Sequence, residues 1–81
     1  MDRQKWGRRI RSFRKLKGFT QVEFAKHIGY SVSIVGEVER GVRMPDRTFL
    51  SRVSTVLDIS IAELTPDEYT TQLEGKGEDY V

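Results

Sequence analysis

Small hydroxyl and amide side chains stand at the start of two short segments in the middle of the sequence. Thr20 and Gln21 begin the first segment, and Ser31 begins the second. If both segments are helical, the backbone N–H groups at their starts lack intrahelical partners, so each start is a natural site for an anion. Arg40 and Arg43 flank the loop at the end of the second segment and can reach the same polyanionic strand. The chemistry that this pattern indicates is the binding of phosphate groups.

Catalytic and metal-binding chemistry lack the residues that they need. The only histidine, His27, lies near the end of an apolar-periodic segment, where a surface or capping role is more common than general base catalysis. No residue at nucleophilic or metal-ligand spacing accompanies it, and the sequence contains no cysteine. We therefore expect no enzymatic activity, no catalytic residue, no metal and no cofactor.

The size and composition indicate one small globular domain. The chain has 81 residues, of which 37% are apolar and 32% charged, which is enough apolar surface for one core and too much charge for a membrane span. The basic N-terminus lacks the apolar run of a secretory signal. The sequence therefore predicts a cytoplasmic protein without a membrane partner.

The net charge of +2 conceals two parts of opposite sign. Residues 1–65 hold 13 Lys and Arg against 7 Asp and Glu, whereas residues 66–81 hold one Lys against 5 acids. A basic body with an acidic tail favours a polyanion as the partner of the body, with a merely solvated charged surface as the alternative. We expect residues 1–65 to form the folded domain and residues 66–81 to form an acidic tail that is partly helical and then disordered.

Apolar residues at helical spacing and capping residues predict five short helices in the body. Thr20 with Glu23 and Ser60 with Glu63 have the pattern of capping boxes, and Ser31 and Asp46 are further N-cap candidates. The expected helices are a first that carries Trp6, Ile10 and Phe13 and ends at Gly18; a second from about Gln21 to His27, which ends at Gly29; a third from Ser31 to near Gly41; a fourth that carries Leu50, Val53 and Leu57; and a short fifth that contributes Ile59, Ile61 and Leu64 to the core.

Two further features are a possible helix after the fifth and the short link between the second and third helices. Pro66 after Thr65 predicts a short sixth helix in the tail, with Tyr69 and Leu73 on one face. Only Gly29 and Tyr30 separate the second and third helices, so these two helices must meet at a steep angle, as in a helix-turn-helix. If Ile34, Val35 and Val38 of the third helix face inward, five residues face outward: Val32, Ser33, Gly36, Glu37 and Arg40.

Residues 6–64 resemble the phage-repressor and Cro type of helix-turn-helix, the XRE family. The resemblance rests on several markers in register, which are Ile10, Arg14, the Thr20-Gln21 start, Ala25, Gly29, the Val38-Glu39-Arg40-Gly41 exit, Pro45, Leu50 and Val53. It implies an all-α fold, a compact five-helix repressor-type helix-turn-helix bundle, in which the third helix enters the major groove of double-stranded DNA. The function that it implies is sequence-specific DNA binding by a transcriptional regulator. Such a regulator would most simply repress by occupying promoter DNA, and activation through contact with the polymerase is equally compatible with the residues.

The expected DNA contacts divide into base readers and backbone contacts. Val32 can meet a thymine methyl group, Ser33 a base edge, and Glu37 the N4 amino group of cytosine. Glu37 has two alternative roles, which are pairing with Arg40 and rejection of guanine by repulsion. The expected backbone contacts are Thr20, Gln21, Ser31, Gly36, Arg40 and Arg43, and the role of Gln21 is taken over from the family.

The resemblance also implies a structural ion pair between Arg14 and Glu39, which joins the first helix to the third and sets the orientation of the reading helix. The basic run on the first helix has a solvated surface as its simplest interpretation, with Trp6 packed at the edge of the bundle rather than stacked on a base.

One recognition helix spans only a few base pairs, so we expect a homodimer on a two-fold symmetric site, formed by the fifth helix with Tyr69 and Leu73. An antitoxin or a restriction-modification controller that uses the same module remains an alternative, as does a protein-interaction module that has lost DNA binding.

Overall fold

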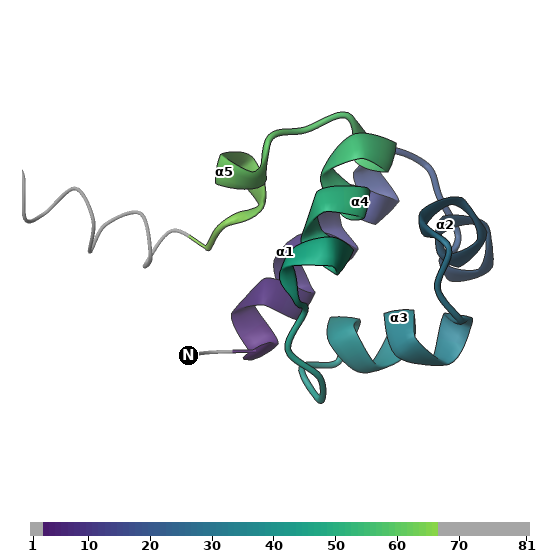
Figure 1. Ribbon diagram of the computed structural model, residues 1–81, viewed down its shortest axis with the longest axis horizontal. Helices are drawn as coiled ribbons and strands as arrows, with labels where there is room; N and C mark the ends of the chain where they lie inside the picture. The colour runs from purple at the N-terminus through teal and green to yellow at the C-terminus, as the bar shows by residue number, and fades with distance from the viewer. Residues whose placement is uncertain (1–2, 67–81) are drawn as a thin grey trace, which may run out of the picture.

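The computed structural model describes residues 3–66, which form five helices joined by short loops (Figure 1). In chain order the helices are α1 (Arg3–Leu16), α2 (Gln21–Ile28), α3 (Val32–Glu39), α4 (Arg47–Leu57) and α5 (Ile61–Leu64). The part of the chain that the structure describes contains no strand. The predicted all-helical, five-helix fold is therefore confirmed. The predicted sixth helix, with Tyr69 and Leu73, and the remainder of the acidic tail lie outside the described residues.

Four of the helices begin at the capping residues that the sequence predicts. Thr20 and Ser60 form complete capping boxes with Glu23 and Glu63. Ser31 accepts a hydrogen bond from the backbone N–H of Ile34, and Asp46 accepts one from that of Phe49. A side chain that satisfies a backbone donor at a helix start stabilises the helix by about 1 kcal/mol. Local chemistry therefore fixes the starts of α2, α3, α4 and α5.

All five helices contribute to one core. Its fully buried side chains are Phe24, Ile10, Ile28, Leu57, Leu64, Val35, Val38 and Val53, and Trp6, Ala25 and Phe49 are nearly so. Trp6 is 6% exposed, so it packs in the bundle as expected. Figure 1 shows α1 and α4 crossing in the middle, with α2 and α3 at one end and α5 at the other. The core thus fixes α3 at the edge of the molecule.

Several apolar residues differ from the expected pattern. Ile61 is 44% exposed although it was expected in the core, because the single turn of α5 directs Leu64 inward and leaves Ile61 outside. Leu16 and Val22 are exposed, and Ile34 and Leu50 are only half-buried. Phe49 is buried in the core, although the apolar spacing of the fourth helix had not singled it out.

Gly7 lets the backbone of α1 approach the backbone of α3 closely. A Cβ atom added to Gly7 would lie 2.7 Å from the carbonyl oxygen of Glu39 and still closer to that of Val38. These neighbours are backbone atoms, so no side-chain rotation could make room for a larger residue. Gly7 therefore permits the contact that holds α3 against α1.

Across residues 3–66, no helix combines the length and the apolar character that crossing a bilayer would require.

Candidate nucleic-acid interface

The turn between α2 and α3 is fixed by backbone conformation and by contacts with α4. Gly29 ends α2 in the left-handed region, at φ 78°, which a glycine adopts without strain. Arg52 of α4 donates a hydrogen bond of 3.1 Å from Nη1 to the carbonyl oxygen of Ile28, and its guanidinium group lies over the ring of Tyr30. The same ring packs edge-on against Phe49. These contacts hold α3 at a fixed angle to α2.

The α3 helix presents one apolar and one polar face. Val35 and Val38 are fully buried in the core. Val32 is 43% exposed, Ser33 is exposed, and the side chain of Glu37 is 34% exposed. The structure therefore brings the three predicted base-reading residues together on the outer face of α3.

Gly36 is not accessible on this outer face, which corrects the expectation that it faces outward. It is buried, and a Cβ atom added to it would meet Nη1 of Arg40 at 2.9 Å. The side chain of Arg40, one turn later, lies back across the helix and covers the glycine. Arg40 itself is exposed, so its guanidinium group and not the Gly36 backbone forms the surface here.

Glu37 forms an ion pair with Arg43 in the loop after α3. Nε of Arg43 lies 2.7 Å from Oε1 of Glu37. The backbone N–H groups of Val42 and Arg43 both donate to the carbonyl oxygen of Glu37, at 2.9 and 3.2 Å. The loop is thus attached to Glu37 through main chain and side chain. Of the two alternatives considered for Glu37, pairing with Arg40 is replaced by pairing with Arg43, a residue six positions away.

The start of α2 is already partly occupied by a carboxylate. The backbone N–H of Thr20 donates to Oε1 of Glu23 at 3.0 Å, and the Thr20 hydroxyl accepts from the N–H of Glu23 at 3.1 Å. The hydrogen bond from the Thr20 backbone is the main reason why the pKa of Glu23 lies below its ordinary value. Thr20 therefore acts as a cap, and its own N–H is engaged within the chain.

Arg14 and Glu39 meet in the buried seam between α1 and α3. Nε of Arg14 donates to Oε2 of Glu39 at 2.7 Å and Nη2 donates to Oε1 at 3.1 Å, with the two side chains 8% and 2% exposed. Nη1 of Arg14 donates to the carbonyl oxygen of Phe19 at 2.8 Å. With two hydrogen bonds to the carboxylate and a third to the carbonyl oxygen, all three nitrogen atoms of the guanidinium group donate a hydrogen bond.

Gln21 is also part of this buried network, a role that sequence reasoning missed. Its amide nitrogen donates to Oε1 of Glu39 at 2.9 Å. An amide group carries two N–H donors, so one remains for a second acceptor. No sequence spacing signals this contact, because 18 positions separate the two residues. The network links α1, the start of α2 and α3 through Glu39.

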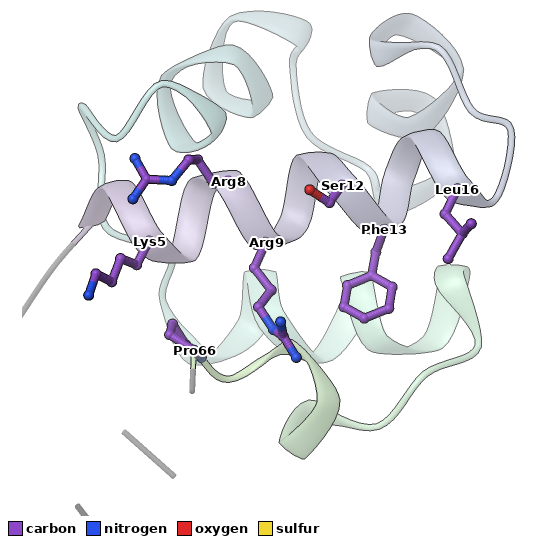
Figure 2. Close-up of a pocket in the computed structure, with 7 residues that line it drawn as sticks. All are labelled: Lys5, Arg8, Arg9, Ser12, Phe13, Leu16 and Pro66. Carbon is purple, nitrogen blue, oxygen red and sulfur yellow. The ribbon is translucent and has the colours of Figure 1, made fainter. Parts of the chain in front are cut away.

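The face of α1 toward α5 carries an open hollow of about 520 Å³, which contains both cations and apolar groups (Figure 2). Arg9 points toward α5, where its Nε donates to the carbonyl oxygen of Glu63 at 2.9 Å, and its guanidinium group also lies over the ring of Phe13. The lining residues are Lys5, Arg8, Arg9, Ser12, Phe13, Leu16 and Pro66. This hollow lies on α1 and contains none of the residues expected to contact DNA.

His27 contacts residues that are close to it in the sequence. Its Nδ1 lies 2.7 Å from the carbonyl oxygen of Glu23, and its ring packs edge-on against Phe19. Among the residues that the structure describes, no three His, Cys, Asp or Glu side chains are grouped so that they could hold a metal ion.

Comparison with protein families gives a match over most of the folded part. The family model described as Helix-turn-helix matches residues 10–64. The uncharacterized HTH-type transcriptional regulator YazB of Bacillus subtilis (strain 168) is 56% identical over 68 residues, which are 84% of this chain and 99% of YazB. The HTH-type transcriptional regulator SinR of the same organism is 35% identical over 71 residues, which are 86% of this chain and 64% of SinR.

Two solved structures share the fold at similar identity. The restriction-modification controller protein C.AhdI from Aeromonas hydrophila superposes with a TM-score of 0.75 at 38% identity, covering 78% of this chain and 96% of C.AhdI. SinR, the master regulator for biofilm formation, in its complex with DNA superposes with a TM-score of 0.69 at 38% identity, covering 73% of this chain and 98% of that chain.

The sequence relatives named above are transcriptional regulators and not enzymes, in agreement with the expectation from the sequence. The family match covers more than half of the chain, and the five helices have the geometry of a repressor-type helix-turn-helix. The chain therefore belongs to the XRE-type helix-turn-helix family of transcriptional regulators.

Proposed function

We propose that this regulator binds double-stranded DNA sequence-specifically, with the outer face of the helix from Ser31 to Arg40 in the major groove. The observation that carries the proposal is the division of α3: Val35 and Val38 are buried, whereas Val32, Ser33 and Glu37 lie together outside. The solved complex of SinR with DNA, which has the same fold at 38% identity, supports DNA binding. A reading helix in the major groove is the general docking mode of helix-turn-helix proteins.

Backbone contacts to phosphates position the protein. The first N–H groups of α2 and α3 lack intrahelical partners, and the positive ends of both helix dipoles favour phosphate. Gln21 keeps one amide donor for this purpose while the other holds Glu39. The proposed phosphate contacts are Thr20, Gln21, Ser31, Arg40 and Arg43, with Gly36 contributing only where Arg40 swings away from it.

Base contacts supply the sequence preference. The methyl groups of Val32 suit a thymine methyl group, the Ser33 hydroxyl can donate to or accept from a base edge, and the Glu37 carboxylate can accept from cytosine. None of these is the frequent pairing of arginine with guanine, so each half-site provides limited discrimination.

A homodimer reads two half-sites about 34 Å apart, which is one turn of DNA. The proposed dimer surface is α5 with Tyr69 and Leu73, and the exposed Ile61 on α5 supports it. Repression follows most simply from occupation of a promoter. The cytoplasmic location expected from the sequence remains part of this proposal, because promoter DNA is the proposed partner.

Selection of bound fragments from random double-stranded DNA tests the proposal. We expect a two-fold symmetric consensus, and a Kd that weakens with salt at a log–log slope of about −0.9 per phosphate contacted. Ser33→Ala is expected to relax one position of the consensus, whereas Ser51→Ala, on the exposed surface of α4, leaves it unchanged. No enrichment of any sequence, together with a Kd that is flat in salt, would instead support a protein-interaction module.

Control of a restriction-modification operon is the second candidate, and the likeness to C.AhdI favours it. Both candidates bind DNA in the same manner and differ only in the promoter that they occupy. Mapping the selected consensus onto the source genome separates them, because a controller would have its sites beside restriction and modification genes.

A further inference from the structure

We propose that Arg43 and Glu37 act as one specificity-determining unit, in which Arg43 orients the Glu37 carboxylate so that it selects cytosine in the target. This inference rests on the proposed function, because it assigns a particular base and a positioning residue to the same DNA-binding face. Arg43 is here a partner of the reading residue and does not itself read the base.

The geometry restricts the carboxylate directly through the side chain of Arg43 and indirectly through the loop that carries Arg43. The 2.7 Å contact from Nε of Arg43 holds Oε1, and the two loop N–H groups that donate to the Glu37 carbonyl oxygen hold the loop against the end of α3. With Oε1 engaged, Oε2 remains as an acceptor without a hydrogen bond in the described residues. A carboxylate held in one orientation loses less conformational freedom on meeting a base than one that rotates freely.

Arg43 also offsets the negative charge that Glu37 brings to the DNA-binding face. An isolated carboxylate that approaches DNA is repelled by the phosphates, and this repulsion acts on every sequence alike. Paired with Arg43, the unit carries no net charge. The terminal amino groups of Arg43 are not used in the contact with Glu37, so they are available for a phosphate, which would place the pair between the DNA backbone and the base edge.

The chemistry of the major groove then favours cytosine over guanine, and over adenine, in which the N7 acceptor lies beside the N6 amino donor. Cytosine presents the N4 amino donor, which Oε2 can accept, whereas guanine presents the acceptors O6 and N7, which repel a carboxylate. Arg40 does not provide the same support, since its guanidinium group lies over Gly36. The loop arginine, and not the arginine at the end of α3, therefore determines what Glu37 selects.

The test measures the Kd of the full chain for four operators. One is the selected operator, and the other three differ from it only in the base at the position read by Glu37, so that together they present all four bases there. Wild type is expected to favour cytosine by about tenfold. Arg43→Ala is expected to weaken binding to all four operators and to abolish the preference. Arg43→Lys retains the positive charge without the Nε contact, and it is expected to restore overall affinity but not the preference.

The sign of one mutational effect is the sharpest readout. In the wild-type background Glu37→Ala is expected to weaken binding to the cytosine operator. In the Arg43→Ala background the same change is expected to tighten binding to all four operators, because it removes a carboxylate that no longer has a partner. Arg11→Ala, which removes one exposed arginine from α1, is the control for charge alone and is expected to leave the base preference intact.

The outcomes separate failure of this inference from failure of the proposed function. If wild type has a base preference that Arg43→Ala or Arg43→Lys leaves intact, Arg43 is only a phosphate contact and the inference is wrong. If wild type selects no sequence at all, the proposed function is wrong and the inference with it. The midpoint of chemical denaturation of each variant, measured alongside, identifies any loss of binding that is due to unfolding.

Discussion

Two arginine–glutamate pairs anchor the same helix, and their surroundings give them different roles. In both pairs Nε of the arginine lies 2.7 Å from a carboxylate oxygen of a glutamate on α3. The Arg14–Glu39 pair is 8% and 2% exposed, whereas the Arg43–Glu37 pair is 51% and 34% exposed. Equal distances therefore do not indicate equal energies, because solvent screens the outer pair and does not reach the inner one.

The comparison also explains why one pair is structural and the other is available to a ligand. Glu39 receives three hydrogen bonds, two from Arg14 and one from Gln21, which replace the water that a buried carboxylate loses. Glu37 receives one from the side chain of Arg43 and keeps contact with solvent. The inner pair sets where α3 lies, and the outer pair lies on the surface that α3 presents.

The largest effect is expected from breaking the inner pair. Glu39→Ala leaves the Arg14 guanidinium group buried without its partner, so it is expected to lower the free energy of unfolding by about 3 kcal/mol. Chemical denaturation followed by circular dichroism measures the change. A denaturation midpoint equal to that of wild type would show that burial does not distinguish the two pairs.

A second change tests the backbone contact beside the inner pair. Gly7→Ala places a Cβ atom 2.7 Å from the carbonyl oxygen of Glu39, so α1 and α3 must move apart, at an expected cost of roughly 1–3 kcal/mol in the free energy of unfolding. Gly18→Ala is not a suitable control, since Gly18 has φ 86°. Ser12→Ala, on the exposed face of α1, serves instead and is expected to change the midpoint little.

Breaking the outer pair is expected to affect stability less. Glu37→Ala or Arg43→Ala should each change the free energy of unfolding by about 1 kcal/mol or less, since both side chains are solvated. The same denaturation series measures it. A loss as large as that of Glu39→Ala would mean that the loop after α3 is a structural element comparable to the inner seam.

The smallest effect concerns a carboxylate with neither role. Because the pKa of Glu23 is lowered in the folded state, ionised Glu23 contributes stability that is present above the ordinary carboxyl pKa and is lost as the pH falls through the lowered one. Wild type is therefore expected to exceed Glu23→Gln in Tm at neutral pH, with the difference shrinking in acid. A difference in Tm that stays constant from neutral to acidic pH would contradict this origin.

Much of the fold could be predicted because its signals are local. The caps at Thr20, Ser31, Asp46 and Ser60 act on donors three residues away, so a short window of sequence contains both partners. The register of α3 followed from the spacing of Val35 and Val38. The Arg14–Glu39 pair was inferred from the family resemblance alone, because no pattern in the residues links positions 25 apart.

Most of the errors and omissions share one cause. Gly36 was expected to face outward, but the long side chain of Arg40 covers it. Pairing of Glu37 with Arg40, one turn along its own helix, was one of the alternatives, whereas the partner of Glu37 is Arg43 in the following loop. The burial of Phe49 and the exposure of Ile61 depend on which side of α4 and of α5 faces the rest of the bundle. Gly36 is covered by the residue that caps its own helix, whereas the other results are set by packing between segments that sequence periodicity does not place.

The sequence by itself determined the helices, their starts and the apolar stripe of α3, because helix caps and periodicity act over about one turn of chain. Only the tertiary structure decided that Arg43 and not Arg40 meets Glu37, that Gln21 joins the buried pair, and that Gly7 lies against the backbone of α3. These contacts depend on the angles at which helices pack, and those angles are fixed by the whole core and not by any one segment.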